Sequence, residues 1–474
     1  MGKRLITPPV GGPLIGIPER DLADGSRGVH DQLYARALVL DNGSTIVALV
    51  SVDLFAITQD LTAEIAQKVS AKTGIPPDNV VLVASHTHSG PSVSHTAVGD
   101  EPDGDWMAVL ISEVTNAVED AVKSARLARV GVSVGQCPVT LRLHNRSPEG
   151  KLASASTEPA EEAAVAGEPA DADLGVIRIT DLDGNNIAIL ANFACQPSTV
   201  RSDGAFLISA DFPGILSSLV EKTFLGSVVL FTNGAAADVV HRQYAHDNDQ
   251  TSSGYRDTML VAELLADEMI RLVHRIRPRQ RASLAVAKKR ITLPLDMKKA
   301  PTAAAKQSKT AFQAVSKFEK QVLAGEQQTD GPLLDASTAG FIAESRWVPA
   351  MAEKVRRGKL SRQVETALWA VSLGNIGMIA VPGEMYCESG REIKRRSPFK
   401  RTFVLGYAGD YLGYLAPRDV YEKGGWEVEE AFKYLPGPGL PLVAGTVEDT
   451  LVGQMLSLVR SVKSKGAEQR VTNG

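Results

Sequence analysis

The stretch NVVLVASHTHSG, residues 79–90, is a short apolar run that ends in two histidines two positions apart. The run is rich in valine and too short for a helix, which is typical of a buried strand. Upstream, residues 58–74 have an apolar side chain at every fourth position, a threonine that can cap a helix and a glycine that can end one. The two segments therefore predict a helix followed by a strand.

The sequence ARALVLDNGSTIVALVSVDLF, residues 35–55, precedes that helix and predicts a β-hairpin. Two β-rich runs flank Asn42-Gly43, and Asn-Gly favours a type I′ turn. The second run ends at Asp53, so the order strand–helix–strand predicts a parallel pair in an α/β sheet. Because sites in such sheets form beyond the carboxyl ends of the strands, we expect Asp53 and His86 to be neighbours.

The rest of the chain continues to alternate between strand and helix patterns. We expect helices at 105–125 and 253–276, a hairpin at 174–196, an exposed loop at 156–173, and an insertion of mostly helical pattern around 296–370. This order predicts an α/β fold of mixed β-sheets flanked by helices, in which the insertion is helical.

Several apolar strands end in the same way, in a small group of polar residues. These groups are His86 with His88, Gln196, Asp238 with His241, Glu384, and Tyr411 with Tyr414. A sheet that brings these strand ends together would build one pocket. We therefore expect a single catalytic domain over residues 1–474.

Composition and charge exclude several classes of protein. The formal net charge of -4 gives no basic surplus for nucleic acid, and no apolar run of about 18 residues predicts an integral membrane segment. The three cysteines are widely spaced, which fits a reducing compartment. The first 16 residues contain no signal-peptide hydrophobic region. We expect a cytoplasmic protein, with secretion of a processed form as the open alternative.

The pair His86 and His88 allows two interpretations. Side chains two apart on a strand share one face, and two imidazoles on one face are a common start for a zinc site. Alternatively, they form a polar strand end that is hydrogen-bonded to loops. Glu384, which follows IAVPG, is open in the same way, because a carboxylate at the start of a helix can merely favour the helix dipole.

Seven motifs occur in the order found in the neutral (non-lysosomal) ceramidase family, and the chain resembles that family over roughly residues 5–430. The motifs are SHTHSGP (85–91), NRSP (145–148), NFACQP (192–197), SADFPG (209–214), NGAAADV (233–239), VPGE (381–384) and GYAGDYLGY (406–414). Only about 40 residues follow the last matched region, so we expect no carboxyl-terminal β-sandwich domain.

The resemblance implies a zinc-dependent hydrolase of the amide bond of an N-acylsphingosine. It places His86 at a zinc-ligand histidine and Glu384 at the carboxylate ligand. Tyr414 best matches the tyrosine ligand, with Tyr411 as the alternative if the loop register shifts by three. His88 matches a substrate-side histidine that can act as general acid or base.

The same resemblance places further residues near the substrate. Arg146, in NRSP, matches an arginine near the substrate carbonyl, and it or Tyr414 could stabilise the developing oxyanion. Asp238, in NGAAADV, is counted with them as a catalytic candidate. The substrate would be a small-molecule or lipid-like amide, and the oligomeric state stays open.

Two departures from the family separate this chain from an ordinary ceramidase. Gln196 stands where the family has a further ligand histidine, and Val240 stands where it has an active-site serine. His241 could replace the missing imidazole, with an oxygen ligand from Asp53, Asp211 or Asp238. A site richer in oxygen would favour Mn or Mg over Zn.

We therefore predict a metal-dependent hydrolase of an amide or related acyl bond, whose substrate is not a standard ceramide. The alternative is a non-catalytic relative that binds a ligand after losing the functions now held by Gln196 and Val240.

Overall fold

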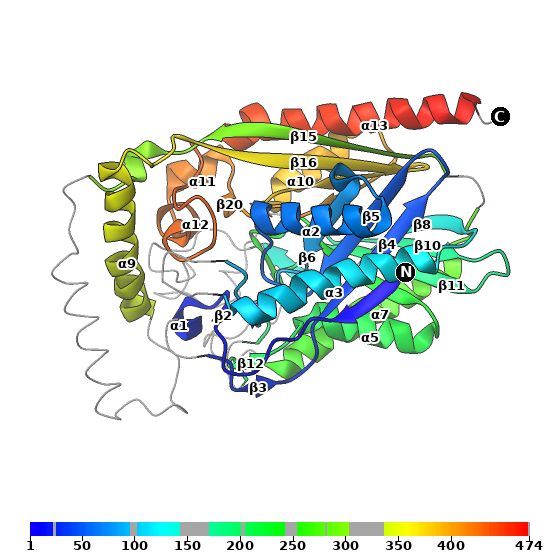
Figure 1. Cartoon of the computed structure of the whole chain (residues 1–474), viewed down its shortest axis with the longest axis horizontal. Helices are drawn as coiled ribbons and strands as arrows, with labels where there is room; N and C mark the ends of the chain where they lie inside the picture. Colours follow the sequence, from blue (N-terminus) through cyan, green and yellow to red (C-terminus); the bar gives the residue numbers. More distant parts are fainter. Residues whose placement is uncertain are drawn as a thin grey trace.

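The structure is a computed structural model. It describes residues 1–21, 25–94, 102–142, 170–200, 204–241, 254–279, 282–302 and 336–472. Three four-stranded sheets form its centre, and helices cover the outer face of each (Figure 1). The predicted α/β class with mixed sheets flanked by helices is confirmed.

The first sheet contains the strand that ends before His86. Its order is β1 (Gly2–Leu5), β4 (Tyr34–Asp41), β5 (Ile46–Val52) and β6 (Val80–Ala84). Strands β5 and β6 are parallel, as the strand–helix–strand order predicts. Helices α2 (Gln59–Thr73) and α3 (Gly104–Lys123) cross the front of this sheet in Figure 1.

The second sheet has the order β13 (Val228–Asn233), β11 (Asn186–Phe193), β10 (Asp173–Thr180) and β8 (Arg129–Gln136). Strands β11 and β13 are its parallel pair. Helices α5 (Asp211–Thr223) and α7 (Tyr255–Arg275) cover it along the bottom of Figure 1.

The third sheet has the order β15 (Leu284–Pro294), β16 (Gln363–Leu373), β17 (Ile376–Ala380) and β19 (Arg401–Leu405). Strands β17 and β19 are parallel. Helix α13 (Val452–Thr472) runs along the top of β15 and β16 in Figure 1, and α10 (Cys387–Arg396) lies against β19.

All three sheets share one apolar interior. Leu49 of β5, Leu190 of β11 and Trp369 of β16 are buried in the same cluster. Side chains alternate along a strand, so Val50 points the other way, into the cluster under α2 and α3. Each sheet is therefore buried on both faces, which explains the continuous apolar runs in the sequence.

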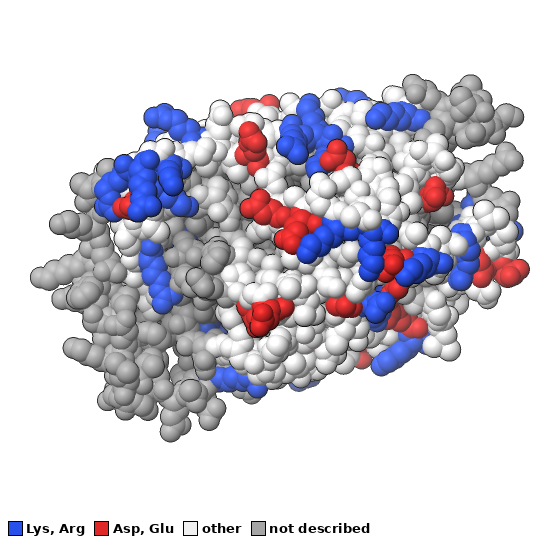
Figure 2. All heavy atoms as spheres, viewed as in Figure 1, with Lys and Arg blue, Asp and Glu red and all other residues white. Residues whose placement is uncertain are grey.

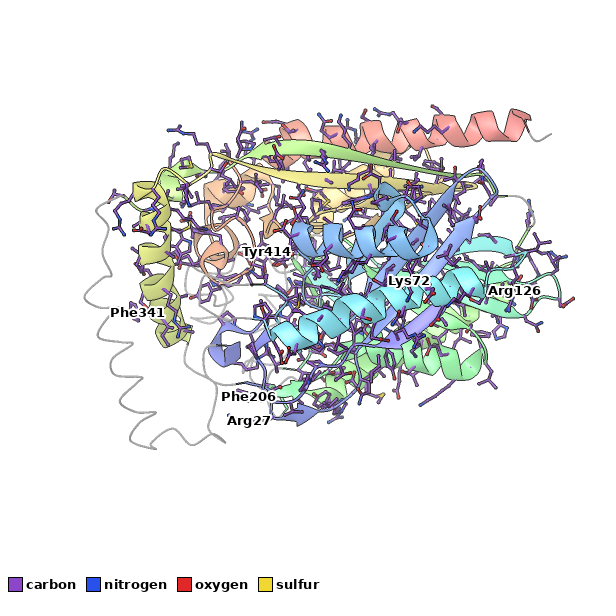
Figure 3. The ribbon with its side chains drawn as sticks, in the orientation of Figure 1. Arg27, Lys72, Arg126, Phe206, Phe341 and Tyr414 are labelled. Atoms are coloured by element: carbon purple, nitrogen blue, oxygen red, sulfur yellow. The ribbon has the colours of Figure 1, made fainter. Side chains whose placement is uncertain are left out.

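Four short strand pairs fix the loops at one end of the sheets. They are β2 (Leu14–Ile15) with β7 (Gly90–Pro91), β3 (Gly28–Val29) with β12 (Leu207–Ile208), β9 (Thr140–Arg142) with β14 (Val239–His241), and β18 (Glu384–Met385) with β20 (Tyr414–Leu415). Beside β3 and β12, the Arg27 guanidinium lies 3.8 Å from the centre of the Phe206 ring (Figure 3).

The remaining helices are α1 (Pro18–Asp21), α9 (Ala336–Arg356), α11 (Arg418–Lys423) and α12 (Trp426–Glu429), with short turns at Pro77–Asn79, Met297–Lys299, Ala431–Lys433 and Val447–Leu451. Within the insertion expected at 296–370, the described helix is α9, and the prediction of helix is wrong for residues 363–370, which belong to β16. Residues 303–335 lie outside the described part of the chain, and β16 already begins at Gln363.

The helix predicted after the first hairpin is confirmed with its boundaries. The Thr58 hydroxyl accepts a hydrogen bond from the amide of Leu61 at 3.3 Å, and Gly74 ends α2 with a φ of 77°. The helix expected to begin near Glu384 instead begins at Cys387, because Glu384 and Met385 pair with β20 first. Glu384 is therefore not a helix-terminal charge.

Lysine and arginine side chains alternate with acidic ones over the face shown in Figure 2. Several of these are ion pairs within one helix, such as Lys123 with Glu119 at 2.7 Å. Among the helices of the described ranges, none combines the length and the apolar character that a membrane crossing needs.

Candidate functional site

Each sheet contributes one parallel pair, and the carboxyl ends of the three pairs meet. Strand β6 leads to His86 and His88, β11 leads to Gln196, and β17 leads to Glu384. The amide of Ala84 donates to the carbonyl of Tyr407 at 3.0 Å, which joins the first sheet to the loop after β19. The predicted gathering of strand ends at one place is thus what the topology produces.

Asn233, at the end of β13, connects the three strand ends. Its side-chain nitrogen donates to the carbonyls of Cys195 (2.9 Å) and Ser85 (3.3 Å), which precede Gln196 and His86. Its own carbonyl accepts from the amide of Gly406 at 2.9 Å. The side-chain amide of Asn233 thus joins the first and second sheets, and its backbone carbonyl adds the loop after β19 of the third sheet.

His86 and His88 face each other across 3.2 Å, measured between their Nε2 atoms. The same-face argument from a strand does not apply, because β6 ends at Ala84. Instead His86 has a left-handed backbone with a φ of 69°. This turn brings the two rings to a centroid distance of 4.8 Å, nearly perpendicular to each other.

Both imidazoles are held through their other nitrogen. His86 Nδ1 lies 2.8 Å from the carbonyl of Phe55, and His88 Nδ1 lies 2.8 Å from the carbonyl of Gly16. A carbonyl only accepts, so each Nδ1 carries the proton, and each Nε2 of a neutral ring presents a lone pair. Two facing lone pairs require a positive centre between them, either a shared proton or a metal cation.

Glu384 brings negative charge to this pair. Its Oε2 lies 3.3 Å from His86 Nε2 and 3.2 Å from the side-chain nitrogen of Gln196. Its Oε1 accepts a hydrogen bond from the Tyr411 hydroxyl. The carboxylate is buried, and both of its oxygens are oriented by neighbours.

Aromatic rings enclose His86 on both sides. The Tyr407 ring stacks on it at 3.9 Å, and the Phe55 ring lies 4.3 Å away. Tyr407 also has a left-handed backbone, with a φ of 57°. Strained non-glycine residues are maintained only where the surroundings require them, and they concentrate at functional sites.

Burial sets the protonation of the two tyrosines beside the carboxylate. It raises the pKa of Tyr411 well above its usual value, and the charge of Glu384 raises it further. Burial and the same carboxylate raise the pKa of Tyr407 well above the usual value. Both phenols therefore keep their protons at neutral pH, so Tyr411 is the donor in its bond to Glu384.

Gln196 occupies the position where the family has a histidine. Instead of a nitrogen lone pair, it turns the NH₂ group of its side chain, a hydrogen-bond donor, toward Glu384. Its Nε2 donates to the carbonyl of Ala237 at 3.1 Å and to Glu384. Both partners are acceptors, so the opposite orientation of the amide would place oxygen against oxygen. In this arrangement Gln196 orients the carboxylate.

Of the two candidate tyrosines, Tyr411 places its hydroxyl on Glu384. Tyr414 pairs with Glu384 through the backbone of β20, and its ring lies against Tyr386 and Trp426 at centroid distances of 6.5 and 6.0 Å. Figure 3 shows Tyr414 close to α12. The assignment of Tyr414 as a ligand stays a prediction, and the geometry favours Tyr411.

Asp238 and His241 lie on the loop after β13. Asp238 accepts from Arg142 Nε at 2.9 Å and from the amide of Cys387 at 2.7 Å, so it fixes the start of α10. His241 is fully buried in β14, and no hydrogen bond or ring contact among the described residues joins it to His86 or Glu384. The described hydrogen bonds of Asp238 thus serve Arg142 and the start of α10.

The other candidates are placed as follows. Val240 is buried in β14 opposite Leu141, where it offers no polar group. Asp53 is paired with Arg36 at 2.6 Å. Asp211 accepts from the amide and hydroxyl of Thr199. Arg146 lies outside the described residues.

Two pairs of side chains at this place have the separation expected of two ligands of one metal ion. Ligands of a tetrahedral zinc at 2.0–2.1 Å are about 3.3 Å apart, and the His86–His88 and His86–Glu384 separations are 3.2 and 3.3 Å. No set of three or more His, Cys, Asp or Glu side chains within the described ranges is already arranged to hold an ion. A bound ion would have to draw these side chains to a common point.

Three contributors to the site were missed in the sequence. Gly16, with a φ of 118°, supplies the carbonyl for His88 although it is 72 residues away. Tyr407 and Asn233 stand inside motifs that were noted, but their packing and bonding roles depend on partners from other sheets. Membership of a motif was the one sequence signal for Tyr407 and Asn233, and Gly16 had no such signal.

The fold and these strand ends define a class, an α/β protein whose three sheets deliver two imidazoles, a side-chain amide and a carboxylate to one buried place. The chain belongs to the neutral/alkaline non-lysosomal ceramidase family, whose N-terminal region matches residues 3–242. The predicted resemblance is confirmed.

Relatives and solved structures agree with this membership. Neutral ceramidase A and neutral ceramidase B of Dictyostelium discoideum are 30% and 29% identical over 206 and 208 residues, which are 41% and 42% of this chain. The match covers only 28% of either relative. The crystal structure of neutral ceramidase from Pseudomonas aeruginosa covers 98% of this chain and 74% of its own, with a TM-score of 0.69 and 16% identity. At that identity the likeness shows the fold.

Proposed function

We propose that the protein is a metal-dependent hydrolase of an amide or related acyl bond. The observation that carries the proposal is the pair of imidazole nitrogens, 3.2 Å apart, beside the Glu384 carboxylate. Both Nδ1 atoms are bonded to backbone carbonyls, so the facing Nε2 atoms can share either a proton or a metal cation, and we propose the cation. Membership of the ceramidase family supports the amide bond as the target.

His86 and Glu384 would hold the ion, with Tyr411 or Tyr414 as the phenol near it. A metal held there would lower the pKa of a bound water and would polarise the scissile carbonyl. We favour Zn because of the imidazoles, with Mn or Mg as the alternatives that a loss of one histidine would permit.

The chain's own residues prepare this place for hydrolysis. Tyr411 and Gln196 donate to Glu384, so its two oxygens are fixed in direction. Phe55 and Tyr407 cover His86 and keep bulk water from the ring. Val240 offers no nucleophile, so the acyl group is attacked by water directly. Arg146 and Tyr414 are our candidates for the donors to the developing oxyanion.

We propose a small-molecule or lipid-like amide as the substrate, and one other than a standard ceramide. This choice is supported by Gln196 and Val240, which replace residues that the ceramidase mechanism uses.

A second candidate function is a non-catalytic relative that binds a ligand in the same place. Gln196 and Val240 favour it, because each removes a reactive group from the family's set. The two candidates differ in one requirement, since a bound metal with hydrolytic turnover is needed only by the first.

The experiment measures metal content and turnover in the same preparation. Elemental analysis of the purified protein, before and after reloading with Zn, Mn or Mg, gives the stoichiometry. A panel of N-acyl amides of increasing chain length tests hydrolysis. We expect one metal per chain, lost in His86→Ala and Glu384→Ala but kept in His274→Ala, a histidine exposed on α7. A protein that takes up none of the three metals refutes the proposal.

A further inference from the structure

We propose that His88 is itself a metal ligand and replaces the histidine that Gln196 has displaced, while Gln196 is a positioning residue for Glu384. This inference rests on the proposed metal centre. It changes the roles read from the sequence, in which His88 handles protons and Gln196 or His241 binds the ion.

The separation of the two imidazole rings matches that of two ligands of one ion. His88 Nε2 lies 3.2 Å from His86 Nε2, the distance at which two ligands of one tetrahedral ion stand, about 3.3 Å. His88 therefore stands where a second imidazole ligand of that ion would stand.

Hydrogen bonds on both sides fix the position of His88. Its Nδ1 is bonded to the carbonyl of Gly16, and its own carbonyl accepts from Arg20 at 2.7 Å. A β-carbon on Gly16 would lie 2.8 Å from Cγ of the His88 ring. A hydrogen bond from Nδ1 to a backbone carbonyl is the usual support of a ligand histidine, because it fixes the tautomer and the ring direction.

Gln196 acts on Glu384 and not on the ion. Its nitrogen has no lone pair to give, and this nitrogen faces the carboxylate. The bond to the Ala237 carbonyl holds it in that orientation. Gln196 thus supplies to Glu384 what an outer-shell partner supplies to a ligand, and a change at such a position typically lowers metal affinity by about 10–100-fold.

The consequence for chemistry is that His88 is not the general base. A lone pair that points at the ion is unavailable to a water molecule. The base must be another group on the water side of the ion.

The test compares metal affinity, by competition with a chromophoric chelator, and the visible spectrum of the Co(II) form. The proteins are the full-length chain and its variants His88→Ala, Gln196→Ala and His274→Ala. We expect His88→Ala to lose at least 100-fold in affinity and to change the Co(II) spectrum. Gln196→Ala should keep one ion with an affinity lowered no more than 100-fold, and His274→Ala should match the wild type.

A double variant, His88→Ala with Gln196→His, adds a rescue. It returns an imidazole to the family's position, so affinity should recover at least tenfold over His88→Ala alone. If His88→Ala is unfolded by circular dichroism, His88→Gln takes its place. Wild-type affinity and spectrum in the His88 variant, or complete loss of metal in Gln196→Ala, overturns the inference alone. A wild-type protein that binds no metal overturns the proposed function as well, so the two failures are distinguishable.

Discussion

The imidazole of His86 stacks on the phenol ring of Tyr407, with centroids 3.9 Å apart and planes 16° from parallel. Both residues have a positive φ, although they come from different sheets. Of the residues that the structure describes, only Asp211 shares this backbone conformation without being glycine. The strain is thus concentrated where two strand ends meet, and each ring fixes the other.

Replacing Tyr407 by phenylalanine separates the ring from its hydroxyl. The ring should keep the stack, and the hydroxyl has no hydrogen-bond partner within the described residues. We expect Tyr407→Phe to be as stable as the wild type or more stable in urea unfolding, with unchanged metal affinity. Tyr411→Phe is the matched comparison, because the Tyr411 hydroxyl donates a hydrogen bond to Glu384. This variant should lose roughly 1–3 kcal/mol of the free energy of unfolding. A large loss in Tyr407→Phe would show that its hydroxyl has a bound partner.

Gly16→Ala should displace His88 and thereby disturb the site. The new β-carbon meets the His88 ring, so the ring must move from its 3.2 Å contact with His86. Gly11→Ala is the matched control, since Gly11 has a similar φ of 108° and nothing within 4 Å of the added carbon. Gly11→Ala should lose roughly 1–3 kcal/mol from backbone strain, and Gly16→Ala should lose more, because the backbone Cα of His88 lies 2.9 Å from its added carbon. Only Gly16→Ala should weaken metal binding, by tenfold or more, and equal affinities would contradict our view of His88.

Local sequence patterns predicted the elements of the fold well. The α2 helix begins and ends at the residues that its cap and glycine indicate, and β5 and β6 are parallel as expected. These features depend on interactions within a few residues. The type I′ turn predicted at Asn42-Gly43 is wrong: the amide of Asn42 donates to the carbonyl of Thr45, so the central residues are Gly43 and Ser44, and of these only Gly43 has a positive φ, 86°.

The site was predicted only to the level of its strand ends. The choice between Tyr411 and Tyr414 depends on the side from which each tyrosine approaches Glu384, and the start of α10 depends on the pairing of β18 with β20. The orientation of Gln196 depends on a carbonyl 41 residues away. Such choices follow from contacts between sheets, which no local pattern contains.

The stability of the fold should fall as pH rises through about 6, in part because of Asp211. Burial raises the pKa of this carboxyl from 3.8 to about 6, against the opposing effect of its bonds from Thr199 and Phe212. The folded state therefore holds the proton more tightly than the unfolded state. The stabilising contribution is complete below pH 3.8 and is lost through pH 6, in total roughly 3 kcal/mol.

Urea unfolding between pH 4 and 7.5 checks this dependence. Asp211→Asn does not titrate, so its free energy of unfolding should fall less steeply with pH than that of the wild type. Asp183→Asn, an exposed turn residue, should keep the wild-type slope. Parallel curves for wild type and Asp211→Asn would show that the carboxyl is ionised throughout.

Asn233 should be sensitive to substitution, because its buried side chain bonds to the ends of strands from the first and second sheets. In Asn233→Ala, the carbonyls of Ser85 and Cys195 lose their donor, and the amide of Cys195 loses its acceptor at 3.3 Å. Each buried group left without a partner costs roughly 1–3 kcal/mol, so the total loss should exceed about 3 kcal/mol. Asn116→Ala, whose amide donates to Glu113 on the outside of α3, should lose under about 1 kcal/mol.

Asn233→Asp removes the donor of the Asn233 side chain while keeping its size and its acceptor. It keeps the volume and the acceptor for Cys195, but it turns a carboxylate oxygen toward two carbonyls that need a donor. We expect it to be at least as unstable as Asn233→Ala at neutral pH and to recover part of the loss in acid, where the carboxyl is protonated. The displaced Ser85 carbonyl adjoins His86, so metal affinity should fall in both variants. If affinity stayed at the wild-type value while stability dropped, the alignment of the strand ends would not depend on Asn233.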